Sequence, residues 1–522
     1  MIELPPFSLF YLAALAAAVL PRVPRRALML AVPVVSCAAL LQLPSDLLVS
    51  MSILDLQLEP LRVDRLSRLF GILFHIGAFI GIVFSLHSRD RTQHVAALAY
   101  AGSALGAVFA GDLLTLFVFW ELLAVSSVFL IFASRTERSY GAGMRYLIIQ
   151  IISGVLLLAG ALILYRQSGS LRFEHIGLSG AGSMLIFIAF GIKCAFPLLH
   201  NWLTDAYPEA TPTGTVFLSA FTTKVAVYAL ARGFAGTEVL VYIGAVMTCF
   251  PIFYAVIEND LRRVLAYSMI NQIGFMVVGI GLGTALAING AIAHAFNDVI
   301  FKGLLMMSMG AVLHMTGRMN GSDLGGLYKS MPITTTFCIV GAASISAFPL
   351  FSGFVSKSMV MVAVLEEGHP VVWLALLFAS AGVFHHAGIK IPFFAFFAHD
   401  SGIRTKEAPT NMLIAMGIAA TLCIGIGVWP WILYDLLPFA VDYTPFDGSH
   451  ILAQIQLLVF SAAAFAWLKV AGIYPPELHS TNIDVEWLYR RLAPRWVQKI
   501  TATLRRAAET TSRAGENLGR NL

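Results

Sequence analysis

Charged residues are scarce in this chain. Asp, Glu, Lys and Arg make up 12% of its 522 residues and apolar residues make up 58%, and the mean hydropathy is +0.80. Soluble domains carry roughly 25% charged and 45–50% apolar residues. The shortage of charge therefore excludes an ordinary soluble protein and indicates an integral membrane protein.

Cysteine is also rare, and the motifs that hold cofactors are missing. The five cysteines, at positions 37, 194, 249, 338 and 423, stand singly in apolar runs, and no CxxC or CxxCH occurs. This pattern gives no support to iron–sulfur, haem or zinc sites, and no glycine-rich turn is present to hold a dinucleotide. We expect no cofactor, no metal and no catalytic residue in this chain, so that any redox chemistry would belong to partners.

The net charge of +5 does not indicate nucleic-acid binding, because the basic residues gather at the ends of apolar runs. With the N-terminus outside, clusters such as those at 22–26 and 262–263 fall on the cytoplasmic side, as the positive-inside rule expects. No basic stretch precedes the first apolar run, which argues against a cleaved signal peptide. We expect a multi-pass protein of the plasma or inner membrane with a cytoplasmic tail. That basic tail either lies along the membrane surface or is a soluble helix or partly disordered segment.

Long apolar runs fill most of the chain and predict an all-α, polytopic fold. At about 20 residues per span we expect 14–15 transmembrane helices, near 8–20, 25–43, 66–87, 94–110, 112–133, 146–165, 183–203, 213–233, 238–258, 264–283, 286–314, 333–365, 371–398, 411–435 and 451–471. We divide the chain into N-terminal helices (1–90), a core (91–400), C-terminal helices (401–475) and the tail (476–522).

Two of these runs contain similar segments with a proline inside, AFPLLHNWL (195–203) and AFPLFSGFV (347–355). Pro197 has no N–H for the carbonyl of Lys193, and Pro349 has none for Ile345, so each helix should kink or break. Freed backbone at membrane depth is tolerated where it is buried in protein or lines a cavity. Broken helices in corresponding positions of two halves indicate a transport site.

Charges inside the predicted spans are the strongest functional signal. Glu121, Lys193, Lys224 and Lys357 lie in otherwise apolar runs, where an ionised side chain costs at least about 2.5–3.5 kcal/mol. Lysine releases its proton when it is desolvated and binds it again near a carboxylate, which favours proton movement. The alternatives are a structural carboxylate at Glu121 and a lysine at 193 that reaches the interface.

A further stripe, His294, Asp298 and Lys302, has the i, i+4, i+8 spacing of one helix face. It predicts a proton relay, or alternatively an Asp298–Lys302 pair that neutralises itself. Lys390, beside His385 and His386, is another cation in an apolar run, and it either takes part or extends to the interface.

Two carboxylates, Asp205 and Glu209, follow the first predicted break. They belong to the loop that closes the broken helix, or are simply solvated there.

Five motifs in order carry a resemblance to a known superfamily: WELLAVSSVFLI, GIKCAFPLLHNWLTDAYPEATPTGTVFLSAFTTKVAVYAL, ENDLRRVLAYSMINQIGFM, HAFNDVIFKGLLMMSMG and AFPLFSGFVSKSM. The stretch from about 65 to 400 resembles the antiporter-like subunits of respiratory complex I and the large subunits of Mrp-type multisubunit cation/proton antiporters. Within the superfamily it is more similar to the D-type subunits of Mrp antiporters. The resemblance implies two inverted five-helix repeats, about 91–235 and 236–400, each with a broken helix around a hydrated axis.

The resemblance also implies roles for the buried charges. Glu121 would pair with Lys193, Lys224 would connect the two halves, and the remaining members would be a central relay and a terminal lysine, namely His294, Lys302 and Lys357. Asp298 departs from the family pattern, in which histidine is common, and Lys390 has no counterpart that we can assign.

The leading hypothesis is a proton-translocating component of a multisubunit antiporter for Na⁺ or another monovalent cation, with other membrane subunits as partners. The alternative is a membrane component of an NADH:quinone oxidoreductase or hydrogenase-type complex. A transporter that acts alone on a small solute is a third hypothesis.

Overall fold

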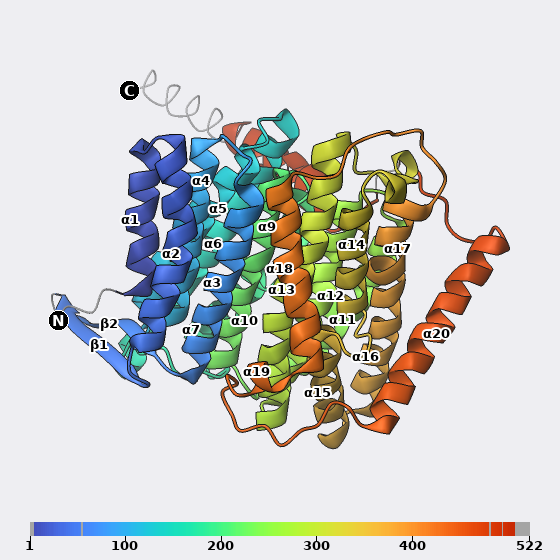
Figure 1. Cartoon of the computed structure of the whole chain (residues 1–522). Coiled ribbons are helices and arrows are strands. Elements are labelled where there is room, and N and C mark those ends of the chain that lie inside the picture. The colour runs from blue at the N-terminus through green and yellow to red at the C-terminus, as the bar shows by residue number, and fades with distance from the viewer. Residues whose placement is uncertain (1–4, 54–55, 480–481, 493, 507–522) are drawn as a thin grey trace, which may run out of the picture. The chain divides into compact units, whose positions relative to one another are not determined.

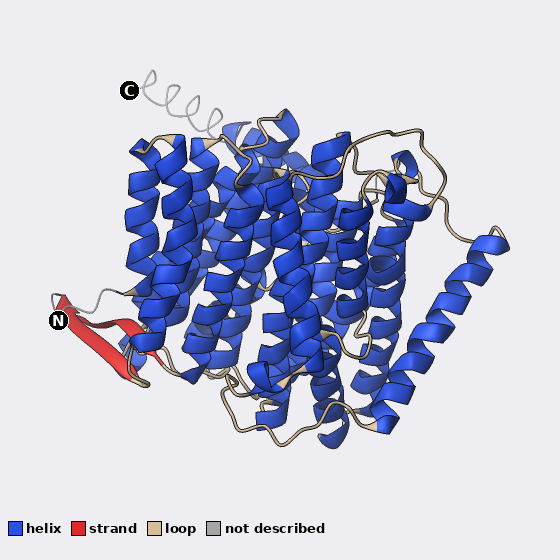
Figure 2. Ribbon diagram, in the orientation of Figure 1, coloured by secondary structure: helices blue, strands red, loops and turns tan. Residues whose placement is uncertain are grey.

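Helices form nearly all of the regular structure (Figures 1 and 2). The computed structural model describes residues 5–53, 56–479, 482–492 and 494–506, and contacts divide the chain into two units, 1–480 and 481–522. Eleven helical segments of the described chain are long and apolar enough to cross a membrane: α2 (Arg22–Gln42), α3 (Arg65–Ser85), α5 (Leu113–Phe132), α6 (Glu137–Ser168), α9 with α10 (Pro212–Gly233), α11 (Val239–Ile257), α12 (Leu261–Leu282), α13 (Ala285–Thr316), α16 to η4 (Pro370–Phe397), α18 (Thr410–Val428) and α20 (Gly448–Val470).

The other helices are shorter or less apolar: α1 (Pro6–Val19), α4 (Arg91–Phe109), α7 (Ala181–Lys193), α8 (Asn201–Ala206), α14 (Pro332–Ile345), α15 (Ser352–Glu366) and α19 (Trp431–Tyr434). The predicted all-helical, multi-spanning fold is confirmed. The predicted runs 183–203 and 333–365 each contain two helices rather than one. A small antiparallel hairpin, β1 (Leu47–Ile53) and β2 (Leu56–Val63), was not predicted. In the second unit, η5 (Leu488–Leu492) is a short π-helical segment.

Four aspartates stand at the starts of helices. The carboxylates of Asp64, Asp90, Asp112 and Asp260 each accept hydrogen bonds from the first backbone N–H groups of α3, α4, α5 and α12. Aspartate is a favoured N-cap because its oxygen satisfies N–H groups that have no partner within the helix. These caps define where the four helices begin.

The interior of the first unit is formed by helices whose apolar residues are almost all covered by other helices. The spans α9–α10 and α12 are buried along their whole apolar length. By contrast, α20 lies at the edge of the bundle (Figure 1), and only Leu458 and Phe465 of its residues are buried. Polar residues on α10, α12 and α13 therefore lie far from lipid.

Candidate functional site

Both predicted helix breaks are present. In the first break α7 ends at Lys193, and Ala195 takes a positive φ of 60°. The Phe196 N–H donates to the Gly191 carbonyl at 3.0 Å, which is the long hydrogen bond of a Schellman motif. Pro197 and Leu198 (φ 69°) then form the centre of a type II turn, in which the Leu199 N–H donates to the Phe196 carbonyl at 2.9 Å.

The second break repeats this backbone. Ala347 has φ 56° and Leu350 has φ 72°, and the Phe348 N–H donates to the Ala343 carbonyl at 3.0 Å. Four of the six non-glycine residues with positive φ in the described chain lie in these two breaks. Such a conformation costs roughly 1–2 kcal/mol for a residue with a Cβ. Strain of this kind gathers at functional sites, so the shared AFPL segments mark the breaks as more than chance similarity.

Lys357 binds the carbonyl that the second break exposes. Its Nζ lies 3.2 Å from the Ile345 oxygen, which Pro349 leaves without an N–H partner. The same ammonium lies 5.0 Å from the centre of the Phe275 ring. A buried lysine thus completes the hydrogen bonding of the broken helix.

Lys193 is fully buried and so does not extend to the interface. Its Nζ donates to the Trp120 carbonyl at 3.0 Å and lies 4.9 Å from the Trp120 ring. Glu121, the next residue on α5, is near enough to attract it electrostatically, but the described residues show no direct ion pair between them. One Glu121 oxygen is buried without a hydrogen-bond partner, and Gly154 leaves the space that this carboxylate fills.

A fully buried ion pair joins α10 and α13. The Nζ of Lys224, on α10, lies 2.5 Å from Oδ2 of Asp298, on α13. Lys224 also donates to the Ser219 carbonyl at 3.2 Å. The alternative of a self-neutralising Asp298–Lys302 pair is therefore not what the structure has. Spacing of four residues places both on one face, but the ammonium of another helix reaches the carboxylate instead.

The rest of the stripe bonds to neutral groups. Lys302 donates to the Ser268 hydroxyl at 2.7 Å, and the His294 ring nitrogens lie 3.0 Å from the Ser356 hydroxyl and 3.1 Å from the Gln272 carboxamide oxygen. Sequence reasoning missed these three partners. Ser268 and Gln272 stand four residues apart in apolar α12, and this spacing was the available signal.

Lys390 is fully buried. Its Nζ donates to the carbonyls of Val256 (2.7 Å) and Glu258 (2.6 Å) at the end of α11, and it pairs with Glu477 at 3.0 Å. Burial raises the pKa of the Glu477 carboxyl, and the charge of Lys390 opposes that rise. His386, one turn before Lys390, is buried, and its ring nitrogens have no hydrogen-bond partner in the described chain.

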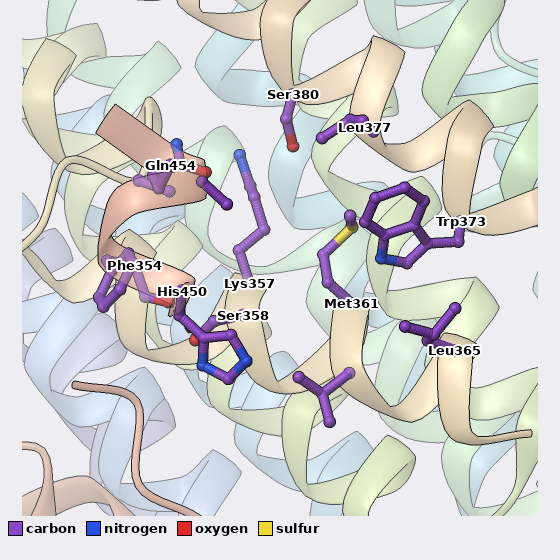
Figure 3. Close-up of a pocket in the computed structure, with 13 residues that line it drawn as sticks. Phe354, Lys357, Ser358, Met361, Leu365, Trp373, Leu377, Ser380, His450 and Gln454 are labelled. Carbon is purple, nitrogen blue, oxygen red and sulfur yellow. Dashed lines mark hydrogen bonds between the residues drawn. The ribbon is translucent and has the colours of Figure 1, made fainter. Parts of the chain in front are cut away.

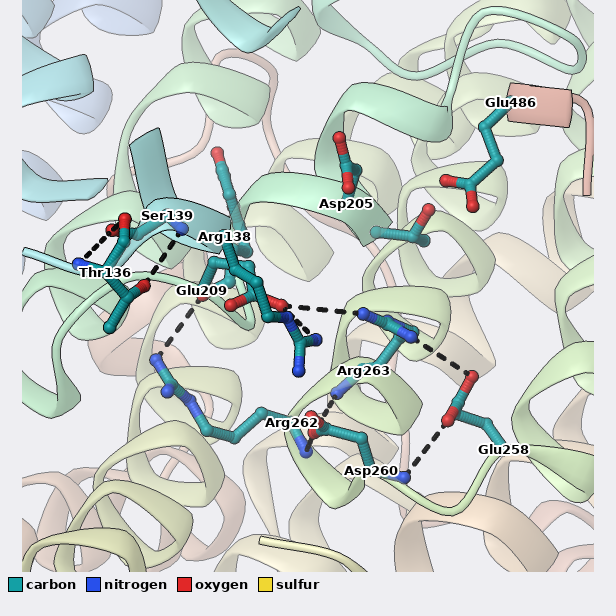
Figure 4. A network of polar contacts seen from close by, with 12 residues as sticks. Thr136, Arg138, Ser139, Asp205, Glu209, Glu258, Asp260, Arg262, Arg263 and Glu486 are labelled. Carbon is teal, nitrogen blue, oxygen red and sulfur yellow. Dashed lines mark hydrogen bonds and ion pairs between the residues drawn. The ribbon is translucent and has the colours of Figure 1, made fainter. Parts of the chain in front are cut away.

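Arginines hold both carboxylates that follow the first break, and Figure 4 shows the contacts around Glu209. Asp205 is buried and accepts two hydrogen bonds from Arg145, at 2.7 and 3.1 Å. Glu209 lies 2.6 Å from Arg138 and 3.9 Å from Arg263. Asp205 is therefore not the solvated loop charge of the alternative interpretation, and it anchors α8 to α6.

A cavity of about 170 Å³ adjoins Lys357, between α15, α16 and α20. Figure 3 shows Lys357 extending between Gln454 and Ser380, with His450 on the same wall. The Gln454 amide donates to the carbonyl of Ser346, in the second break, at 2.9 Å. Lys357 thus borders a cavity, and α20 contacts the second break beside it.

Several polar side chains buried in the first half have no protein partner for at least one atom in the described chain. They are Gln150, Asn201, Tyr207 and Thr223. Buried groups of this kind are normally satisfied by ordered water. Together with the buried ionisable groups, they make a polar interior that extends from α5 through α10 and α13 to α15.

Comparison with known proteins gives this arrangement a family. Residues 110–381 match the profile described as NADH:quinone oxidoreductase/Mrp antiporter, transmembrane. The chain is 31% identical over 427 residues to the A-type subunit of the Na(+)/H(+) antiporter of Alkalihalophilus pseudofirmus, covering 71% of this chain and 52% of that protein. It is 28% identical to the D-type subunit from the same organism (63% and 72% covered). It is 25% identical to hydrogenase-4 component B of Escherichia coli (76% and 66% covered).

Solved structures share the fold. An Mrp complex from Dietzia sp. superimposes with a TM-score of 0.82 at 22% identity, over 96% of this chain and 60% of that chain. A chain of the archaeal membrane-bound sulfane sulfur reductase gives 0.75 at 23% identity, over 96% and 100%. The chain spans only about half the length of the A-type antiporter relative. Because the profile covers half of the sequence, with both breaks and the buried charges from Glu121 to Lys357 inside it, the chain belongs to the NADH:quinone oxidoreductase/Mrp antiporter transmembrane family.

Proposed function

We propose that this protein is the proton-translocating component of a multisubunit monovalent cation/proton antiporter, with Na⁺ as the exchanged cation. The observation that carries the proposal is the fully buried Lys224–Asp298 pair, which joins two halves that each contain a broken helix with a buried lysine. We assign proton movement to the row that contains this pair: Glu121, Lys193, Lys224, His294, Asp298, Lys302, Lys357 and Lys390.

The chemistry follows from burial. A desolvated ammonium without a counter-charge tends to release its proton, and a carboxylate beside it favours the charged form. Separation of Lys224 from Asp298 would therefore pass a proton onward, and closure of the pair would bind the next one. Lysine suits this role because arginine stays charged under all ordinary conditions.

The relatives support the assembly. Two of them are named as subunits of a Na(+)/H(+) antiporter, which favours other membrane subunits as partners and Na⁺ as the cation. We further propose the two inverted repeats, about 91–235 and 236–400, and a plasma or inner membrane location with a cytoplasmic tail.

Everted membrane vesicles test the proposal. Lys193→Ala and Glu121→Ala should each abolish cation-dependent proton movement, measured with a pH-sensitive dye, while the protein stays in the membrane. The matched control is Lys406→Ala, because Lys406 is exposed in a loop and its loss should leave transport unchanged. Near-normal activity in both core variants would contradict the assignment.

A second candidate is a proton-pumping membrane component of a redox complex. It is favoured by the similarity to hydrogenase-4 component B. Isolation of the native complex and identification of its other chains separates the two. Small antiporter subunits would support the first function, and subunits with cofactor motifs would support the second.

A further inference from the structure

Arginines gather at one end of the bundle, where α2 and α4 begin. Three stand in the first turns of α2, and two stand at the start of α4: Arg22, Arg25, Arg26, Arg89 and Arg91. Arg25 is repelled by Arg91 and Arg22, and Arg22 by Arg26 and Arg89. The five arginines therefore lie near enough to repel one another, and we call them the arginine cluster.

The arginine cluster has little counter-charge. None of its members forms an ion pair within the described residues, and the nearest carboxylate, Asp90, caps α4 and pairs with Arg135 at 3.3 Å. Three members donate only to neutral carbonyls: Arg22 to His87, Arg26 to Leu86, and Arg91 to Ala18. The positive-inside rule accounts for basic residues at this face, but it does not account for five arginines of which none forms an ion pair within the described residues.

Two further features make this end of the bundle suited to an anion. Helix N-termini carry a partial positive charge, so arginines there are unfavourable unless an anion is present. Asp90 caps α4, whereas α2 has no side-chain cap and no acidic residue in its first turn. Arg25 is only 4% exposed, and its Nε is buried without a hydrogen-bond partner in the described chain. A buried guanidinium N–H without an acceptor indicates that an anionic acceptor belongs there.

An apolar groove of about 430 Å³ lies between α1, α4 and α5, beside the start of α4. Arg91 lines its end, and Val95, Leu122 and Phe129 form its walls. Its polar groups are already satisfied, since the Tyr11 and Ser103 hydroxyls bond to each other at 2.8 Å. The walls suit a hydrocarbon chain, and the end suits a negative group at headgroup depth.

We propose that this groove binds an anionic phospholipid, with its phosphate on the arginine cluster and an acyl chain between α1, α4 and α5. Basic pockets between transmembrane helices on the cytoplasmic side bind anionic headgroups in this way. This proposal does not depend on the transport function.

The full chain, purified in mild detergent with whatever subunits accompany it, provides the test. Phosphatidylglycerol should bind by native mass spectrometry and raise the thermal midpoint, whereas phosphatidylcholine and inorganic phosphate should do neither. Each arginine removed should weaken binding roughly fivefold, so Arg25→Gln/Arg91→Gln should lose about thirtyfold. Arg89→Gln, at an exposed position without structural bonds, should lose fivefold in a protein that still folds.

Two further variants separate the headgroup from the chain. Ala99→Phe fills the groove at a lining position and should reduce phosphatidylglycerol binding with the arginine cluster intact. Arg318→Gln/Lys406→Gln removes two exposed charges elsewhere and should have no effect. Equal stabilisation by phosphatidylcholine, by phosphate alone, or in the Arg25→Gln/Arg91→Gln variant would overturn the proposal. So would a crosslink from Leu122→Cys to another protein of the complex in the absence of bound lipid.

Discussion

The two helix breaks share a backbone but hold their lysines on opposite sides. Lys193 is the last residue of α7, before the first break, and it bonds to the Trp120 carbonyl of α5. Lys357 follows the second break, on α15, and bonds back to Ile345, whose carbonyl that break exposes. The first lysine therefore reaches across to another helix, whereas the second supports its own broken helix.

The breaks also differ in how closely their chains approach. Position 353 is glycine, and a Cβ there would overlap the Ser344 carbonyl, whereas the corresponding position of the first break is Asn201. The second break is the tighter one. The two breaks thus share one backbone motif but differ in their surroundings. Substitutions at matched positions test how far the two breaks are equivalent.

The largest loss of stability is expected at the Lys224–Asp298 pair. Asp298→Leu leaves Lys224 buried without its carboxylate and should destabilise the protein by about 3–5 kcal/mol, whereas Lys224→Met/Asp298→Leu should be far milder. Both variants should lose proton movement in vesicles. Thermal unfolding of both variants measures the difference. A double variant as unstable as the single one would show that the pair does more than neutralise itself.

The next largest difference in stability is expected between Gly353→Ala, in the second break, and a matched substitution in the first. The added methyl group would meet the Ser344 carbonyl, so we expect a loss of roughly 1–3 kcal/mol from overpacking. Asn201→Ala, at the matched position of the first break, should change stability much less. Chemical or thermal unfolding in detergent compares the two, and equal losses would contradict the difference in tightness.

Replacement of Lys193 and of Lys357 should destabilise the protein to different extents. Lys357→Met leaves the Ile345 carbonyl buried without a partner, which costs about 1–3 kcal/mol. Lys193→Met removes the donor to the Trp120 carbonyl. This carbonyl lies in the middle of α5 and keeps its hydrogen bond within the helix. We expect Lys357→Met to be the less stable variant, although both should stop transport. The midpoints of thermal unfolding decide it, and the reverse order would disprove the structural role of Lys357.

The smallest effect concerns backbone strain. Leu198 and Leu350 have positive φ and are 70% and 55% exposed. Changing either to glycine relieves about 1–2 kcal/mol of strain and adds roughly 0.5–1 kcal/mol of unfolded-state entropy, so stability should change by less than about 1 kcal/mol. Leu162→Gly, at a helical position of similar exposure (52%), should cost about 1 kcal/mol. Losses at 198 or 350 as large as at 162 would count against strain in the breaks.

Sequence reasoning located the breaks because the cause is local. Pro197 and Pro349 lack an N–H wherever they stand, so the helices had to end before them. The same reasoning did not find the partner of Asp298. An i, i+4 spacing establishes only that Asp298 and Lys302 share a face, while Lys224 arrives from another helix. Glu477 was missed for the same reason, since only the return of the chain after α20 places it on Lys390.

The sequence by itself determined that the chain spans a membrane many times, where its helices run, where two of them break and which charges lie at membrane depth. Those properties depend on composition and on neighbouring residues, which a linear sequence displays. Only the tertiary structure decided which of those charges meet and which bond to neutral groups instead. It also decided that five arginines from two separate segments lie near one another and that Arg91 borders an apolar groove. Contacts between distant segments depend on how the helices pack, and helical spacing alone does not specify that packing.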